Sequence, residues 1–158
     1  MLQPNDVLKE LQDLRDNGFL SDTHLRRAVK DIAAADDRFD WVGVYLVNSE
    51  ENVVWLHNYV GRSTEHSKIP IGEGVCGTAV AEGENTNVPD VSAVDHYIEC
   101  DRRTKSEMVV LIRDGDEIFG LINIESRTEE AFTDEDNAAV QSLADQLAEQ
   151  LAQERERS

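Results

Sequence analysis

The chain has 158 residues and a formal net charge of −18, with 33 acidic side chains against 15 basic ones. A charge of that sign repels phosphate backbones and anionic lipid surfaces, so we expect no nucleic acid and no membrane as partner. Neither a basic leader nor an apolar run opens the sequence, which predicts a cytoplasmic protein. The acids are spread along the chain, and we interpret them as an adaptation to a salty cytoplasm that screens their repulsion.

The length fits one domain, residues 1–158, because no linker-like segment divides the chain. Leucine, valine and isoleucine recur at helical spacing within residues 1–36, which predicts two N-terminal helices. Asn17-Gly18 interrupts the pattern, and Ser21 or Asp22 is expected to cap the second helix.

Two pairs of apolar segments follow, each joined by a short polar turn. Residues 41–47 and 53–60 are rich in β-branched and aromatic side chains, which predicts a β-hairpin. Residues 108–112 and 118–124 predict a second hairpin. Residues 133–155 predict a long amphipathic helix. Since helices at both ends bracket an antiparallel sheet, the predicted class is α+β.

Between the hairpins lies a long segment, residues 63–105, which we expect to be irregular apart from a short helix after Gly74. It contains both cysteines of the chain. Segments of that length inside a compact domain are usually functional, so we expect catalytic or binding residues in this one.

The two cysteines have different surroundings. Cys76 near a predicted helix N-terminus could be stabilised as a thiolate by the helix dipole, or it could be a small buried hydrophobe, and the two readings have equal weight. Cys100 precedes the basic residues Arg102, Arg103 and Lys105, which favour a thiolate unless neighbouring acids offset them in a solvated loop. We therefore expect Cys100 to be the more reactive thiol.

Acidic and amide side chains mark the ends of the second predicted hairpin. Glu107 is either a partly buried general acid or, more commonly for such a position, an exposed strand end. Asn123 and Glu125 alternate with two isoleucines, so they share one face of the last strand. That face of the strand must point either to solvent or into a polar pocket.

His66 and His96 lie near the two cysteines in the sequence and raise the alternative of a zinc site. Their spacing matches no compact zinc motif. We therefore expect no metal site, and neither a metal nor an organic cofactor.

Several motifs occur in a family-specific order. The first is WVGVY, which starts at Trp41, and the second is GVCGTA, which contains Cys76. The third is the segment that begins with Cys100 and ends with Glu107, and the fourth is FTDED, which precedes the last predicted helix. In this order the chain resembles a GAF domain, and within that superfamily it is most similar to the free methionine-(R)-sulfoxide reductases. The resemblance covers nearly the whole chain.

The resemblance implies a role for individual residues. Cys100 occupies the position of the catalytic nucleophile and Cys76 that of a second cysteine. Glu107 matches a substrate-binding acid, and Trp41 and Tyr45 match the aromatic start of the pocket. The spacings from Cys76 to Cys100 and from Cys100 to Glu107 agree with the family.

The implied mechanism is a thiol-dependent reduction of a small sulfoxide. The Cys100 thiolate attacks the sulfoxide sulfur, while Glu107, helped by Glu125 or Asn123, protonates or hydrogen-bonds the departing oxygen. Cys100 is left as a sulfenic acid. Cys76 then forms a disulfide with it, which a thioredoxin-like dithiol reduces.

The chain also departs from the family pattern. His66 stands where a further cysteine is common, and Tyr97 replaces a histidine, with His96 shifted by one. Asn123 and Glu125 stand where the family has two aspartates. This strand end is more like the GAF modules of signalling proteins, so the alternative function is a non-catalytic module that senses a small ligand or an oxidant.

The terminal helices are expected to form a homodimer. Apolar positions such as Leu147 and Leu151 would need cover if the helices formed only one layer on a small sheet. A dimer is compatible with either function.

Overall fold

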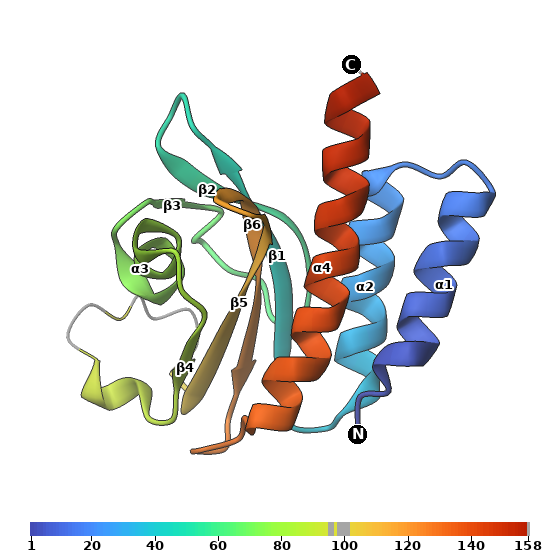
Figure 1. Ribbon diagram of the computed structural model, residues 1–158. Coiled ribbons are helices and arrows are strands. Elements are labelled where there is room, and N and C mark those ends of the chain that lie inside the picture. Colours follow the sequence, from blue (N-terminus) through green and yellow to red (C-terminus); the bar gives the residue numbers. More distant parts are fainter. Residues whose placement is uncertain (95–96, 98–101, 158) are drawn as a thin grey trace.

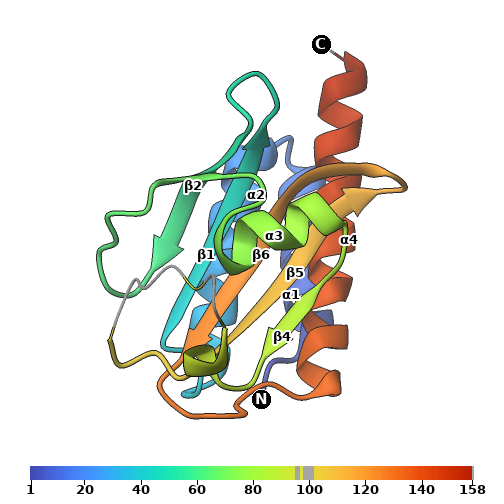
Figure 2. The ribbon, with the colours of Figure 1, turned by 90° about the vertical axis from the view of Figure 1, so that its left-hand side faces the viewer.

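The computed structural model describes residues 1–94, 97 and 102–157, and it has the predicted α+β architecture. A curled antiparallel sheet has the strand order β3-β2-β1-β6-β5-β4. Helices α1, α2 and α4 cover one face, and the short helix α3 covers the other (Figures 1 and 2). The elements are α1 Pro4–Asp16, α2 Ser21–Ala35, β1 Trp41–Asn48, β2 Val53–Val60, β3 Lys68–Pro70, α3 Gly74–Glu82, β4 Thr86–Val88, the 3-10 turn η1 Val91–Ala93, β5 Ser106–Asp114, β6 Glu117–Ser126 and α4 Asp134–Arg157.

Both predicted hairpins are present, as β1–β2 and β5–β6. The first and last long strands meet in the middle of the sheet, where β1 pairs with β6. Segments 41–48 and 117–126, which are far apart in the sequence, therefore lie side by side. Since side chains alternate along each strand, the same strands supply two separate apolar layers, one on each face of the sheet.

The two N-terminal helices form as predicted, but the cap predicted for α2 is wrong. Ser21 is the first helical residue, and the N-cap is Leu20, whose side chain makes no capping hydrogen bond. The backbone N–H and the hydroxyl of Ser21 both donate to the carboxylate of Glu154 in α4, at 2.8 and 2.9 Å. A long-range contact thus supplies the acceptor that a local side chain was expected to provide.

The helices α1, α2 and α4 bury their apolar side chains against one another and against the sheet. Helix α1 packs on α2 and α4, and these two pack on the sheet (Figure 1). Leu147 is 1% exposed, and Leu151 packs against the same core. The premise that these two leucines need cover from a second subunit is therefore wrong, because the chain itself covers them.

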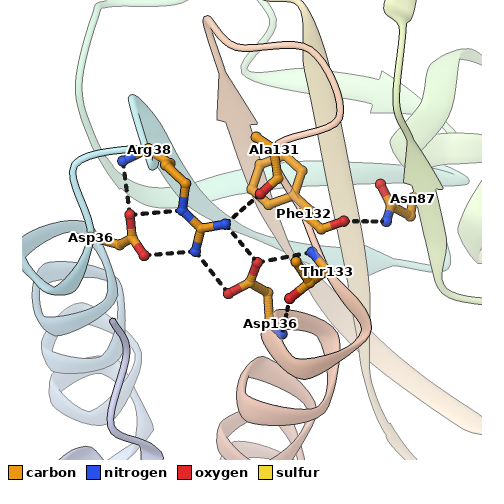
Figure 3. Close-up of polar contacts among 7 residues, drawn as sticks. All are labelled: Asp36, Arg38, Asn87, Ala131, Phe132, Thr133 and Asp136. Carbon is orange, nitrogen blue, oxygen red and sulfur yellow. Dashed lines mark hydrogen bonds and ion pairs between the residues drawn. The ribbon is translucent and has the colours of Figure 1, made fainter.

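A reciprocal pair of polar residues fixes the start of α4. The Thr133 N–H donates to the Asp136 carboxylate at 2.9 Å, and the Asp136 N–H donates to the Thr133 hydroxyl at 3.1 Å. Arg38 donates to the same carboxylate and to that of Asp36, and it also reaches the carbonyl of Ala131 (Figure 3). This network joins the end of α2 to the start of α4.

The segment between the hairpins is more regular than expected. It supplies β3 and β4, which pair at the two opposite edges of the sheet, so the irregular reading of residues 63–105 is wrong for these parts. Helix α3 lies where it was predicted. A Cβ atom at Gly77 would collide with the Pro70 carbonyl, so the glycine allows α3 to approach the end of β3.

Within the described residues, none of the helices combines the length and the apolar character that crossing a membrane requires.

Candidate active site

The face of the sheet beneath α3 carries the polar residues singled out in the sequence. Strand alternation directs Asn123 and Glu125 to this face and the neighbouring isoleucines to the helical layer, as predicted. Glu125 is directly opposite Glu107 on β5 and Trp41 on β1. The structure thus brings together residues from α3 and three strands, namely Trp41, Tyr45, Cys76, Glu107, Asn123 and Glu125.

Glu107 lies in the interior, with only 5% of its surface exposed. Reading it as an exposed strand end is therefore wrong, because α3 packs over this end of β5. The amide nitrogen of Asn123 donates to Glu107 Oε1 at 2.6 Å, and the Cys76 sulfur lies 3.9 Å from the same oxygen as a weaker donor. Three side chains from α3, β5 and β6 thus meet at one carboxyl oxygen.

Burial is the main reason why Glu107 holds its proton. Desolvation, followed by the charge of Glu125, raises the pKa of Glu107 to about 8, although the hydrogen bonds from Asn123 and Cys76 act in the opposite direction. The carboxyl group is therefore largely protonated at neutral pH. A buried acid with a pKa in this range can deliver a proton to a leaving group at neutral pH.

Cys76 is buried, as one of the two interpretations of the sequence has it. It is the third residue of α3, 5% exposed, and it packs in the apolar layer beneath that helix. Its sulfur nevertheless faces a polar group, the Glu107 carboxyl. Cys76 therefore contributes a thiol donor to the site as well as apolar packing.

Cys100 and His96 lie outside the described residues, so the predicted nucleophile stays a prediction. The basic residues that follow Cys100 in the sequence are described, and Arg102, Arg103 and Lys105 are all exposed.

The aromatic residues of β1 form one wall of the site. The Trp41 ring stacks on Tyr59 at a centroid distance of 5.6 Å, and its indole N–H donates to the Arg62 carbonyl at 3.0 Å. The Tyr45 hydroxyl donates to the His66 carbonyl at 3.1 Å. A Cβ at Gly43 would collide with the Trp41 ring, which explains the glycine in the WVGVY motif. Gly43 and Tyr59 were not predicted as residues of the site.

Among the described residues, two small cavities are lined by side chains on this face. The first has about 10 Å³, room for about one water molecule. Its walls are Tyr45, Ile69, Gly74, Val75, Cys76, Glu107 and Asn123. The second has about 20 Å³, and its walls are Asp40, Trp41, Arg62, Ser63, Thr64, Thr104, Glu125 and Arg127. Asp40, Arg62 and Arg127, the charged walls of the second cavity that were not predicted from the sequence, flank the ends of predicted strands.

The described residues contain no group of three or more histidine, cysteine, aspartate and glutamate side chains arranged to hold a metal ion. The zinc alternative includes Cys100 and His96, which lie outside those residues.

The sequence model of the GAF domain matches residues 22–151, which is most of the chain. The chain belongs to the GAF domain family. The free methionine-R-sulfoxide reductase of Escherichia coli strain K12 is 36% identical to it over 113 residues, 72% of this chain and 67% of that protein. The enzyme of the same name from Saccharomyces cerevisiae is 38% identical over 107 residues, covering 66% of this chain and 59% of that protein.

Solved structures agree with this assignment. The free methionine-R-sulfoxide reductase of Neisseria meningitidis, in complex with its substrate, superimposes with a TM-score of 0.88 at 26% identity and covers 98% of this GAF chain and 92% of its own. The reduced form of the Staphylococcus aureus protein gives 0.85 at 30% identity over 96% of each chain. The likeness thus extends to nearly all of the fold.

Proposed function

We propose that this GAF protein reduces free methionine-(R)-sulfoxide to methionine, with Cys100 as nucleophile and Glu107 as proton donor. The observation that carries the proposal is the buried Glu107 carboxyl, which is protonated at neutral pH and receives hydrogen bonds from Asn123 and Cys76. The similarity to reductases from bacteria and yeast supports the substrate.

The first half of the reaction moves one oxygen atom from the substrate to the enzyme. The Cys100 thiolate attacks the sulfoxide sulfur, forming a sulfur–sulfur bond, and Glu107 gives its proton to the sulfoxide oxygen. The resulting hydroxyl group then moves from the substrate sulfur to the Cys100 sulfur, so that the sulfur–oxygen bond of the substrate and the new sulfur–sulfur bond both break. Methionine leaves with the sulfur reduced by two electrons, and Cys100, oxidised by two electrons, becomes a sulfenic acid. Glu107 then recovers a proton from solvent.

The first cavity suits the oxygen end of the sulfoxide. It has room for about one water molecule, and a sulfoxide oxygen is of similar size. Glu107 and Asn123 both border it, so a carboxyl donor and an amide lie where negative charge would develop on that oxygen. Preorganised donors of this kind are the main means by which a protein stabilises such charge.

The second half of the reaction restores the thiols. The Cys76 thiol condenses with the Cys100 sulfenic acid, which forms a disulfide and releases one water molecule. A thioredoxin-like dithiol then reduces that disulfide by thiol–disulfide exchange. This half requires the two Cα atoms to come within about 7 Å of each other.

The competing proposal is a GAF module that binds a small ligand or senses an oxidant without turning over a substrate. One specific observation favours it: the amide of Asn123 hydrogen-bonds Glu107 at a position where the resemblance leads us to expect an acid. The site would then be a binding pocket with a weakened proton donor.

A turnover assay with matched variants tests the two proposals. The reduced protein is incubated with free methionine-(R)-sulfoxide and dithiothreitol, and methionine is measured by chromatography. We expect turnover by the wild type and none by Cys100→Ser. When dithiothreitol is left out, Cys76→Ser should still release about one methionine per protein molecule, because it can form the sulfenic acid but not the internal disulfide. If the wild type does not exceed the Cys100→Ser background, while calorimetry detects a different small molecule in the site, the binding module is the correct reading.

A further inference from the structure

We propose that Tyr59 is a positioning residue for the reductase reaction: together with the bare backbone of Gly43, its ring holds the indole of Trp41 as a fixed apolar wall for the carbon chain of the substrate. This inference rests on the proposed function. Tyr59 lies on β2 and is not among the described residues that line the two cavities, so it acts through Trp41.

The Trp41 ring lies over the next residue on the same face of β1, which is Gly43. A Cβ atom at Gly43 would lie 2.4 Å from Trp41 Cη2 and 2.7 Å from Trp41 Cζ3. Carbon atoms in contact are normally about 3.5 to 4.0 Å apart, so any side chain at position 43 would push the ring away. Gly43 therefore leaves the surface of the sheet open for the indole.

Tyr59 reaches the same ring from the neighbouring strand. It is the cross-strand partner of Gly43, so its side chain stands on the same face of the sheet. The Tyr59 and Trp41 rings stack at a centroid distance of 5.6 Å and an interplanar angle of 17°. An aromatic side chain opposite a strand glycine can cover the backbone that the glycine exposes. Here Tyr59 does so together with the indole, which fixes the two rings against each other.

The turn after β2 fixes the edge of the indole. The Trp41 indole N–H donates to the Arg62 carbonyl at 3.0 Å. A Cβ atom at Gly61 would lie 2.8 Å from Trp41 Cδ1, and Gly61 has a φ of +129°, which favours glycine. Trp41 is only 6% exposed as a result, whereas Tyr59 is 37% exposed. A partly exposed ring thus completes the cover of a buried one.

The wall and the proton donor lie in one row across the sheet. Trp41 is opposite Glu125 on β6, and Glu125 is opposite Glu107 on β5. Adjacent strands are about 4.8 Å apart, so a substrate with its sulfoxide oxygen at Glu107 can reach the indole with its carbon chain. A wall that is already in place needs no ordering when the substrate binds. Because it contacts the substrate in the ground state and the transition state alike, its loss raises KM and leaves kcat unchanged.

The kinetic test compares Tyr59→Ala with Tyr59→Phe, which keeps the stacked ring. We expect Tyr59→Ala to raise KM for free methionine-(R)-sulfoxide by roughly two- to tenfold, the range of one aromatic pair, with kcat unchanged. Tyr59→Phe should keep the wild-type KM. Gly43→Ala, which displaces the indole directly, should raise KM as well. Val60→Ala removes an exposed apolar side chain from the next position of the same strand, and this matched control should change neither constant.

Fluorescence reports on the indole itself. The chain has two tryptophans, so Trp55→Phe leaves Trp41 as the only one. In that background, Tyr59→Ala should make acrylamide quench Trp41 more strongly and should shift its emission to longer wavelength, because the ring loses its cover. Tyr59→Phe and Val60→Ala should leave both properties as they are.

An unchanged KM in Tyr59→Ala or in Gly43→Ala would overturn the positioning role. A lower kcat with an unchanged KM, which indicates a loss of folded protein, would do the same, as would unchanged quenching in Tyr59→Ala or an equal rise of KM in Tyr59→Phe. If the wild type shows no turnover, the proposed function fails, and calorimetry with methionine-(R)-sulfoxide decides the inference. Weaker binding in Tyr59→Ala but not in Tyr59→Phe would support it, and equal binding, or no binding, would reject it.

Discussion

The amide nitrogen of Asn123 lies 2.6 Å from Glu107 Oε1, and both side chains are buried. The hydrogen bond favours the ionised carboxyl, whereas burial and the charge of Glu125 favour the neutral one and prevail. The hydrogen bond from Asn123 therefore limits how far burial and the charge of Glu125 raise the pKa of Glu107.

Replacing this amide by an acid should strengthen the proton donor. In Asn123→Asp the hydrogen bond that lowers the pKa of Glu107 is lost and a second carboxyl is added, so Glu107 keeps its proton to higher pH. We expect the basic limb of the kcat/KM profile to move to higher pH and activity above pH 8 to rise by up to roughly tenfold. Asn123→Leu, which lacks the added charge, is the control. An unchanged basic limb in Asn123→Asp would contradict this role.

Glu107→Gln should change both activity and the pH dependence of stability. Without the proton donor, we expect kcat/KM to fall by at least about a hundredfold. The pKa of Glu107 rises from 4.5 to about 8 on folding, so the folded protein holds a proton that the unfolded chain releases. The free energy of unfolding therefore falls as the pH rises from about 4.5 to 8.

The variant cannot ionise at this position, so its melting temperature should decline less over that interval. Thermal melts of both proteins at a series of pH values measure the difference. Parallel curves for wild type and Glu107→Gln would show that this carboxyl does not hold its proton on folding.

The sequence predicted the elements that carry strong local patterns. Both hairpins have long runs of β-branched and aromatic residues, and the start of α4 has the reciprocal pair Thr133 and Asp136. Strands β3 and β4 were missed because each has only three residues. Such short strands depend on pairing with a neighbouring edge rather than on their own composition.

The site was predictable only in part, for a similar reason. Alternation along β6 was enough to place Asn123 and Glu125 on one face. The burial of Glu107 was not predictable locally, because its hydrogen-bond partners Asn123 and Cys76 are 16 and 31 residues away in the sequence. Only the packing of α3 onto the sheet makes this carboxyl an interior group.

Arg38 should contribute strongly to stability. In Arg38→Gln the Asp136 carboxylate, 2% exposed, loses its cationic partner while it remains in the interior (Figure 3). Leaving a buried charge unpaired is costly, and since Arg38 itself is partly exposed we expect a loss of about 2 to 3 kcal/mol. Chemical denaturation measures it. Arg26→Gln removes a pair in which both side chains are exposed, so it should leave the free energy of unfolding almost unchanged. Similar losses in both variants would contradict a special role for Arg38.

The same network should weaken in acid. Hydrogen bonds from Arg38 lower the pKa of Asp36 to about 2. Burial alone would raise the pKa of Asp136, but the hydrogen bonds from Arg38 and Thr133 and the charge of Arg38 together keep it below its usual value. Folding lowers the pKa of both carboxyls. Their contribution to the free energy of unfolding is therefore present above pH 3.8 and is lost as the pH falls toward 2. Arg38→Gln should accordingly lose less stability over that interval than the wild type does.

The two cysteines should differ in reactivity in the folded protein. Cys76 is 5% exposed and its sulfur lies against Glu107, so an alkylating reagent reaches it only when α3 moves. We expect competitive alkylation near neutral pH, read by mass spectrometry, to label Cys100 first. In urea the two thiols should be labelled at similar rates. Equal or faster labelling of Cys76 in the folded protein would count against Cys100 as the nucleophile.

Oxidation tests whether Cys76 is the resolving thiol. The chain has only two cysteines, so an internal disulfide can form only between Cys76 and Cys100. One equivalent of peroxide should remove both free thiols without forming covalent dimers, because the sulfenic acid at Cys100 condenses with Cys76 inside the same chain. In Cys76→Ser the sulfenic acid should persist and react with dimedone. If the wild type loses only the Cys100 thiol, the Cys76 sulfur stays with Glu107 throughout, and an external thiol must complete the cycle.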